Sequence, residues 1–350
     1  MITNPEVLEE GFTPSELVKR SGEITHLSSI LEPILKDQPV EGAFIYGPSG
    51  TGKTCTSKYL VERLEHVVWG PDVDDPPTVE THHIDCWGGT YTSMAQDVLD
   101  GYDDSVVYHQ NTPKHELSSL LAETITDPYI VVLDEADQLD SDRILYELHE
   151  HPKVTMLLIA NDYNEFYKHL ESRVESRVTT YESVPFEKYQ AHEIASILSD
   201  RVRAATEGDV ITEEQLFDIA DVANNDARIA IGILKNALRT AEREGASRVG
   251  RDHILDVVPE TKREVLAVTY SRLTRDQRIL YQILVEDGEQ SIGEIHETYA
   301  DRVDEPYGQK TVKGYLKKMK HYYLVDWDGE KRGRKYFATT ERLYKQPVTE

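Results

Sequence analysis

The chain has 350 residues and a mass of 39.9 kDa, which corresponds to two or three domains of ordinary size. Hydrophobic residues make up 39% of it, the mean hydropathy is −0.52, and no stretch approaches the roughly 18 apolar residues of a transmembrane helix. Its two cysteines exclude a disulfide scaffold and a cysteine zinc site, and the first residues lack the apolar core of a secretory signal. We therefore expect a globular cytoplasmic protein with no membrane partner.

The charge is distributed unevenly along the chain. The formal net charge is −26 and the isoelectric point is near 4.9, which argues against binding of nucleic acid over the whole surface and is typical of proteins from a high-salt cytoplasm. Residues 310–345, in contrast, carry 11 Lys or Arg and 4 Asp or Glu. This local excess of positive charge indicates a surface that binds an anionic partner.

The first part of the chain alternates apolar strands with amphipathic helices. Residues 24–38 have a helical period, and the apolar run 43–46 leads through a glycine-rich turn into a helix over 55–65. Further buried strands are expected at 81–86, 129–137 and 154–161. This pattern stops near residue 182 and predicts an α/β fold with a parallel sheet, because such sheets are built from apolar strands joined by helices.

Two further segments differ from the first in their pattern. From residue 187 to about 258 the periodicity is helical throughout, with four stretches separated by polar breaks. From residue 262 three helix-like stretches precede a segment, 324–340, that is typical of a β-hairpin. We therefore divide the chain into domains over residues 1–184, 185–260 and 261–350.

The turn between the first strand and its helix carries a phosphate-binding pattern. It matches G-x-x-x-x-G-K-[ST] and consists of Gly47, Pro48, Ser49, Gly50, Thr51, Gly52, Lys53 and Thr54. Glycines allow successive backbone N–H groups to turn toward phosphate oxygens, the lysine reaches the β- and γ-phosphates, and the threonine hydroxyl binds Mg²⁺. The alternative, a glycine-rich turn without a ligand, is disfavoured by the strand before it and the helix after it.

Polar side chains end two of the predicted strands. Asp134 and Glu135 follow one apolar strand, and Asn161 follows the next. In a P-loop NTPase the aspartate serves Mg²⁺ and the glutamate orients a water for attack on the γ-phosphate. Asn161, at the carboxyl edge of the sheet, could hold that water or could only cap the following helix.

These motifs together resemble an AAA+ ATPase. The P-loop, the DEAD sequence at 134–137, Asn161 and the arginine-bearing segment LESRVESRV occur in that order, and Asp226-Ala227-Arg228 resembles the start of the sensor-2 helix in the AAA+ lid. The opening segment, residues 12–35, resembles the N-terminal box of the archaeal replication initiators related to origin-recognition-complex and cell-division-control (Orc/Cdc) proteins. The matching positions are Pro14, Arg20, Glu23, Leu27 and Leu31. The resemblance covers nearly the whole chain and implies an AAA+ base, a helical lid and a C-terminal winged helix for the three predicted domains.

The resemblance also implies a role for each motif residue. ATP and Mg²⁺ would be the cofactors, with residues 47–54 on the phosphates, Thr54 and Asp134 on the metal, Glu135 in hydrolysis and Asn161 as sensor 1. Arg228 would reach the γ-phosphate from the lid. Tyr189 and Arg201 match positions that contact nucleotide in the family, although ordinary helix packing and a surface charge are the alternatives.

Two further features keep their alternatives open. Arg173 and Arg177 compete for the arginine finger, which acts on the ATP of a neighbouring molecule, and either could instead form a surface ion pair. Between Cys86 and Asp134 the sequence lacks the basic helix with which family members contact DNA, so residues 87–90 are the candidate that remains there.

The C-terminal segment separates apolar from basic residues. Val312, Tyr315, Leu316 and Met319 recur at a helical spacing and are expected to face the core. Cations are expected on the opposite face and on the hairpin, and the candidate DNA contacts are Lys310, Lys313, Lys317, Lys320, Arg332, Arg334 and Lys335. Exposed cations of this kind suit phosphate contact, and an arginine on a wing can enter a minor groove. A solvated charged face is the alternative.

The combined interpretation is an ATP-switched DNA replication initiator that binds origin duplex DNA. We expect weak ATPase activity that acts as a switch, a nucleoid-associated location and possible self-association on DNA, and the resemblance implies recruitment of the replicative MCM helicase. The rival hypothesis is a transcriptional or plasmid-maintenance regulator with an AAA+-type core and a winged helix.

Overall fold

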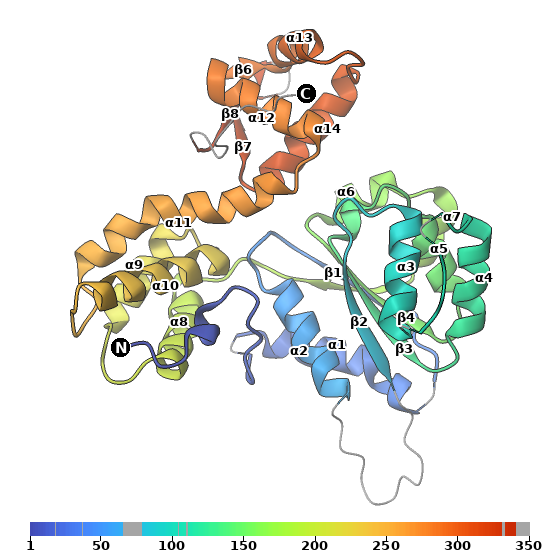
Figure 1. Ribbon diagram of the computed structural model, residues 1–350, viewed down its shortest axis with the longest axis horizontal. Coiled ribbons are helices and arrows are strands. Elements are labelled where there is room, and N and C mark those ends of the chain that lie inside the picture. Colours follow the sequence, from blue (N-terminus) through green and yellow to red (C-terminus); the bar gives the residue numbers. More distant parts are fainter. Residues whose placement is uncertain are drawn as a thin grey trace, which may run out of the picture. The chain divides into compact units, whose positions relative to one another are not determined.

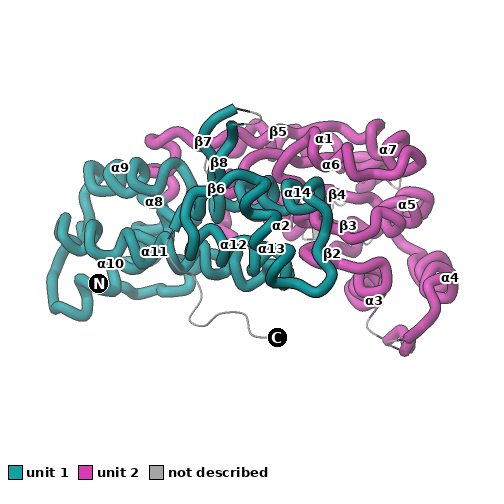
Figure 2. The backbone as a smooth tube through the Cα atoms, turned by 90° about the horizontal axis from the view of Figure 1, so that it is seen from above, with its two compact units in different colours: residues 1–10, 198–350 teal, residues 11–197 magenta. Residues whose placement is uncertain are grey.

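The computed structural model describes residues 1–17, 19–36, 38–65, 79–103, 105–109, 111–330 and 333–340. The chain forms two compact units (Figure 2). One comprises Gly11–Ile197, and the other comprises Met1–Glu10 together with Leu198–Glu350. Among the described residues, no helix has both the length and the apolar character needed to cross a bilayer.

The unit Gly11–Ile197 is built on a five-stranded parallel sheet with the strand order β2-β3-β4-β1-β5. The strands are β1 (Gly42–Tyr46), β2 (Glu80–Asp85), β3 (Tyr129–Asp134), β4 (Val154–Ala160) and β5 (Glu182–Pro185). The predicted parallel α/β sheet is confirmed. Sequence patterning missed β5 because this edge strand is only four residues long and Val184 is its one fully buried residue.

Helices cover both faces of this sheet (Figure 1). They are α1 (Ser21–Leu31), α2 (Lys53–Glu65), α3 (Tyr91–Tyr102), α4 (Lys114–Thr124), α5 (Arg143–Glu150), α6 (Tyr163–His169) and α7 (Ser172–Val178). Successive strand residues point to opposite faces, so Ile130 and Val132 pack with α1 and α2, whereas Val131 and Leu133 pack with α3 to α7. The two apolar layers hold the carboxyl ends of the strands, and the polar residues that follow them, at one edge.

The second unit contains four helices in the region predicted to form a lid. They are α8 (Ala191–Ala205), whose first residues precede the change of unit, α9 (Glu213–Val222), α10 (Ala227–Arg243) and α11 (Arg251–Ser271). The chain's first ten residues pack on this layer, where Ile2 bridges to Thr206 and the short 3-10 helix Pro5–Leu8 buries Val7 and Leu8. Helix α11 continues across the predicted boundary at residue 260, and the predicted domain boundaries stay predictions.

Three helices and a small antiparallel sheet complete this unit. The elements are α12 (Arg275–Asp287), β6 (Gln290–Ser291), α13 (Ile292–Arg302), α14 (Gln309–His321), β7 (Val325–Asp328) and β8 (Lys335–Ala338). The strand order is β6-β8-β7. The order helix, strand, helix, helix, strand, strand is consistent with the predicted winged-helix domain, and that assignment stays a prediction. Val312, Leu316 and Met319 of α14 are fully buried, in agreement with their helical spacing, whereas Tyr315 is half-buried.

Candidate functional site

The P-loop connects β1 to α2 in a conformation that requires glycine. Gly52 has a φ of +87°, and a Cβ at this position would lie 2.6 Å from the Tyr189 hydroxyl. A Cβ on Gly47 would lie 2.0 Å from the carbonyl oxygen of Phe186. The loop is therefore packed closely against residues 186–189, and any side chain at these two positions would displace it.

Lys53 contacts both this loop and a residue that follows another strand. Its side chain is buried, and its Nζ donates to the carbonyls of Gly47 at 2.7 Å and Pro48 at 3.0 Å. The same Nζ donates to Oδ1 of Asn161 at 3.2 Å. Two residues that are 108 positions apart in sequence thus meet, because β1 and β4 are neighbours in the parallel sheet.

Thr54 and Asp134 form a pair of oxygen groups beside Lys53. The Thr54 hydroxyl donates to Oδ2 of Asp134 at 2.6 Å, and His83 Nε2 lies 3.5 Å from the same oxygen. Burial raises the pKa of the Asp134 carboxyl, but contacts with His83 and Thr54 and the charge of Lys53 lower it more, so the pKa lies below its ordinary value. Asp134 is therefore held ionised, as a metal ligand must be.

Glu135 follows in a left-handed backbone conformation, with φ 56° and ψ 41°. Residues other than glycine rarely adopt this conformation, which costs about 1–2 kcal/mol. Strain of this kind occurs at functional sites, where the position of a side chain matters more than backbone stability. The turn redirects the chain immediately after β3.

Arg20 fixes the P-loop from the N-terminal segment, a role that the sequence did not reveal. Its buried guanidinium donates from Nε and Nη2 to the carbonyl of Thr51 at 3.1 and 2.9 Å, and from Nη2 to the carbonyl of Glu187 at 2.8 Å. It also stacks 4.1 Å from the ring centroid of Tyr189. The one available signal was that Arg20 belongs to the N-terminal pattern shared with Orc/Cdc proteins.

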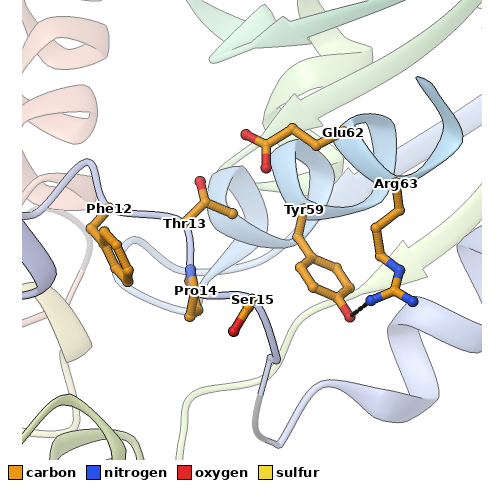
Figure 3. Close-up of a pocket in the computed structure, with 7 residues that line it drawn as sticks. All are labelled: Phe12, Thr13, Pro14, Ser15, Tyr59, Glu62 and Arg63. Atoms are coloured by element: carbon orange, nitrogen blue, oxygen red, sulfur yellow. Dashed lines mark hydrogen bonds between the residues drawn. The ribbon is translucent and has the colours of Figure 1, made fainter. Parts of the chain in front are cut away.

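A pocket of about 450 Å³ adjoins α2, the helix that begins at Lys53 (Figure 3). The segment Phe12, Thr13, Pro14 and Ser15 lines it together with Tyr59, Glu62 and Arg63 of α2. Arg63 donates to the Tyr59 hydroxyl at 2.8 Å, which holds that ring in the wall. Sequence analysis did not predict this pocket, because it depends on the packing of two separate segments.

Arg228 and Arg201 lie in the unit that contains the lid helices. Asp226 caps α10 and also accepts from Nη2 of Arg228 at 3.0 Å, which orients the arginine at the start of the helix. Arg201 is buried, and its Nη1 donates to the carbonyls of Val7 and Glu9. The described contacts of Arg201 therefore hold the N-terminal segment, and the predicted nucleotide contacts of both arginines stay predictions.

The two arginine-finger candidates both make ion pairs. Nε of Arg173 lies 2.9 Å from Glu171, and Nε of Arg177 donates to Glu150 at 2.6 Å. Both guanidinium groups also stack on the ring of Tyr146. The open alternative of a surface ion pair is thus realised for both residues in this chain, and the choice of finger stays a prediction.

The candidate DNA contacts of the predicted winged helix differ in their surroundings. Lys310, Lys313 and Lys335 are exposed, and Lys317 is half-buried. Lys320 forms an ion pair with Asp326 and stacks 4.1 Å from the ring centroid of Trp327, on which Arg334 also stacks at 4.4 Å. Arg332 lies outside the described residues.

The stretch between β2 and β3 contains two helices, α3 and α4, that sequence analysis did not predict. Thr90 forms a capping box with Ser93 at the start of α3, so the candidate DNA contact at residues 87–90 is a helix entry. The loop between the helices exposes Val107, a residue that is 86% accessible to solvent. DNA contact by this region stays a prediction.

Comparison with known proteins now defines the family. An "AAA domain" model matches residues 41–170, and a "Cdc6 AAA+ ATPase-type lid domain" model matches residues 195–257. ORC1-type DNA replication protein 9 of Halobacterium salinarum is 35% identical over 338 residues, which cover 96% of this chain and 93% of that protein. The chain belongs to the archaeal Orc/Cdc family of AAA+ ATPases.

A second relative and two solved structures are also similar to this chain. ORC1-type DNA replication protein 1 of Halobacterium salinarum is 37% identical over 316 residues, or 89% of this chain and 100% of that protein. The Aeropyrum pernix ORC1 protein in complex with DNA shares the fold with a TM-score of 0.74 at 24% identity, over 98% of this chain and 94% of that one. The Aeropyrum pernix ORC2 protein, solved as ADPNP and ADP complexes, has a TM-score of 0.64 at 22% identity, over 97% and 94%.

Proposed function

We propose that this chain is an ATP-switched initiator of DNA replication, which binds Mg²⁺–ATP at the P-loop and duplex DNA with its C-terminal domain. The observation that carries the proposal is the convergence of Lys53, Thr54, Asp134 and Asn161 from three parts of the sequence. The relatives' names support a role in DNA replication, and the names of the Aeropyrum pernix structures support nucleotide and DNA as ligands.

The residues present fit a magnesium nucleotide. Hard oxygen ligands, the Thr54 hydroxyl and the ionised Asp134 carboxylate, lie 2.6 Å apart and suit Mg²⁺. Lys53 provides a buried ammonium that its loop carbonyls hold in place and that can turn to the β- and γ-phosphates. When bound, Mg²⁺ neutralises charge on the phosphates, while Asn161 and Glu135 hold and orient the attacking water.

The pocket beside α2 supports binding of the remainder of the nucleotide. Tyr59 lies one helical turn beyond Cys55, on the face that continues from the P-loop end of the helix. Its ring, the ring of Phe12 and the apolar face of Pro14 provide walls against which a planar base can stack. We therefore infer that the adenine lies in this pocket.

DNA binding is assigned to α14 and the hairpin. Lys310 and Lys313 are exposed on the helix whose other face forms the core, and this segment carries the local positive charge of an otherwise acidic chain. Such cations release counterions from duplex DNA, which supplies affinity without sequence preference. Recruitment of the MCM helicase and self-association on DNA are further parts of this proposal that rest on the family resemblance.

A nucleotide-binding titration tests the central claim. Lys53→Ala should lose affinity for ATP, and Glu135→Gln should retain ATP while turnover stops. Equal ATP affinity in Lys53→Ala and the unaltered protein would refute the P-loop assignment. A genome-wide footprint tests the biological role, because an initiator should be enriched at an intergenic locus with inverted repeats and a transcriptional regulator at many promoters.

A further inference from the structure

His83 adjoins the candidate magnesium site from a strand that carries no part of the P-loop or DEAD motifs. The parallel pairing of β2 with β3 places His83 beside Val132 and Asp85 beside Asp134. This register brings Nε2 of His83 to 3.5 Å from Oδ2 of Asp134. The same carboxylate oxygen accepts the hydrogen bond from the Thr54 hydroxyl, so one oxygen is approached from two directions.

The His83 Nε2 atom is buried and makes no hydrogen bond within the part of the chain that the structure describes. A buried polar nitrogen without a hydrogen-bond partner destabilises the fold. A hydrogen bond to an acceptor that lies a small displacement away removes this cost. Asp134 is that partner: a shift of a few tenths of an ångström would convert the 3.5 Å contact into a hydrogen bond.

We propose that His83 is a positioning residue of the magnesium site, where its Nε2–H holds the Asp134 carboxylate in the orientation required for Mg²⁺. This inference rests on the proposed function. Groups that orient metal ligands contribute strongly to metal affinity, because a freely rotating carboxylate loses conformational freedom when it binds. His83 would therefore act on Mg²⁺ through Asp134 and would not contact the nucleotide.

The neighbouring His82 provides a matched control. It follows the alternation of the strand to the other face, where a Cβ on Gly101 of α3 would lie 2.2 Å from the His82 ring. His82 is half-buried, as is His83. Truncation of either histidine removes the same side chain from the same strand, but only one truncation removes a contact with Asp134.

The test measures binding of a fluorescent methylanthraniloyl-ATP to the full chain, first in EDTA and then during titration with MgCl₂. His83→Ala should raise the Mg²⁺ concentration for half-maximal binding about tenfold, the lower end of the effect of such orienting groups. Its nucleotide affinity in EDTA should stay within about twofold of the unaltered protein. His83→Gln, which keeps an N–H donor at a similar reach, should recover most of the loss, and His82→Ala should show none.

The other outcomes are also decisive. A Mg²⁺ titration of His83→Ala that matches the unaltered protein overturns the inference, as does a His83→Gln variant that is impaired as much as His83→Ala. Equal weakening in EDTA and in Mg²⁺ assigns His83 a purely structural role and also overturns it. If the unaltered protein itself shows no Mg²⁺-dependent binding, then the proposed function fails, and this inference fails with it. Thermal unfolding of each variant identifies any that does not fold, and His83→Leu, which fills a similar volume without an N–H donor, then replaces His83→Ala as the decisive comparison.

Discussion

Replacement of Arg20 by alanine should destabilise the unit Gly11–Ile197 by about 3 kcal/mol and weaken nucleotide binding with it. The guanidinium is buried and donates three hydrogen bonds to the carbonyls of Thr51 and Glu187, besides its ion pair with Glu23 at 2.5 Å. Removal of one partner from a buried charged contact costs about 3–5 kcal/mol, because the other groups are left without solvent or partner. The lower value is appropriate because Glu23 is partly exposed and can be hydrated.

The thermal midpoint gives the expected size in an experiment. For a unit of 150–250 residues, 1 kcal/mol shifts the midpoint by about 2–4 °C, so Arg20→Ala should lower it by about 6–12 °C. The protein has three tryptophans, at positions 69, 87 and 327. In a Trp327→Phe background both remaining tryptophans lie between positions 11 and 197, and Trp87 is the one among the described residues. Its tryptophan fluorescence therefore follows the unfolding of that unit.

Two controls distinguish this loop contact from ordinary charge removal. Lys36→Ala removes an exposed ion pair with Glu32 in the same unit, and such exposed pairs contribute little to stability. Arg20→Lys keeps the charge but cannot reproduce the paired donors or the stacking on Tyr189. The Arg20 effect should persist at high salt, since buried contacts are screened little. A loss no larger than that of Lys36→Ala, or full recovery by lysine, would show that the reasoning is wrong.

Three further expectations use matched variants. Glu135→Gly should be about 1 kcal/mol more stable than Glu135→Ala in chemical unfolding, because only glycine relieves the strain of the left-handed backbone. Equal stability of the two variants would argue against strain. Neither variant should turn over ATP. If Arg177 is the finger, Arg177→Ala should reduce concentration-dependent ATPase activity by about 10³–10⁵-fold, while Glu150→Ala preserves it. Equal effects of the two substitutions would mean that only the ion pair matters. Arg173→Ala compared with Glu171→Ala tests the other candidate in the same way. Lys313→Ala should lower the slope of log affinity for duplex DNA against log salt concentration by about 0.9. Lys320→Ala should lower that slope less, because Asp326 already neutralises the Lys320 ammonium. A larger effect at Lys320 than at Lys313 would contradict this reasoning.

The sequence by itself determined those parts of the site that are contiguous in the chain or lie at the ends of apolar strands. Residues 47–54 form one turn, so their chemistry does not depend on distant contacts. Asp134 and Asn161 could be placed at the same edge because parallel strands end together, and the 2.6 Å contact of Asp134 with Thr54 and the 3.2 Å contact of Asn161 with Lys53 agree with that expectation. The basic and apolar faces of α14 also followed from helical periodicity alone.

The tertiary structure decided which partner each polar side chain meets. The contact of His83 with Asp134 depends on the register of β2 against β3, and the contact of Arg20 with Thr51 depends on where the N-terminal segment crosses the P-loop. Arg201 reaches the Val7 carbonyl 194 residues away, and Lys320 forms an ion pair with Asp326 of the hairpin. Periodicity specifies the face of an element on which a residue lies. The group that this face meets is set by the packing of the whole fold, because burial of apolar surface far from the site dominates the free energy of folding.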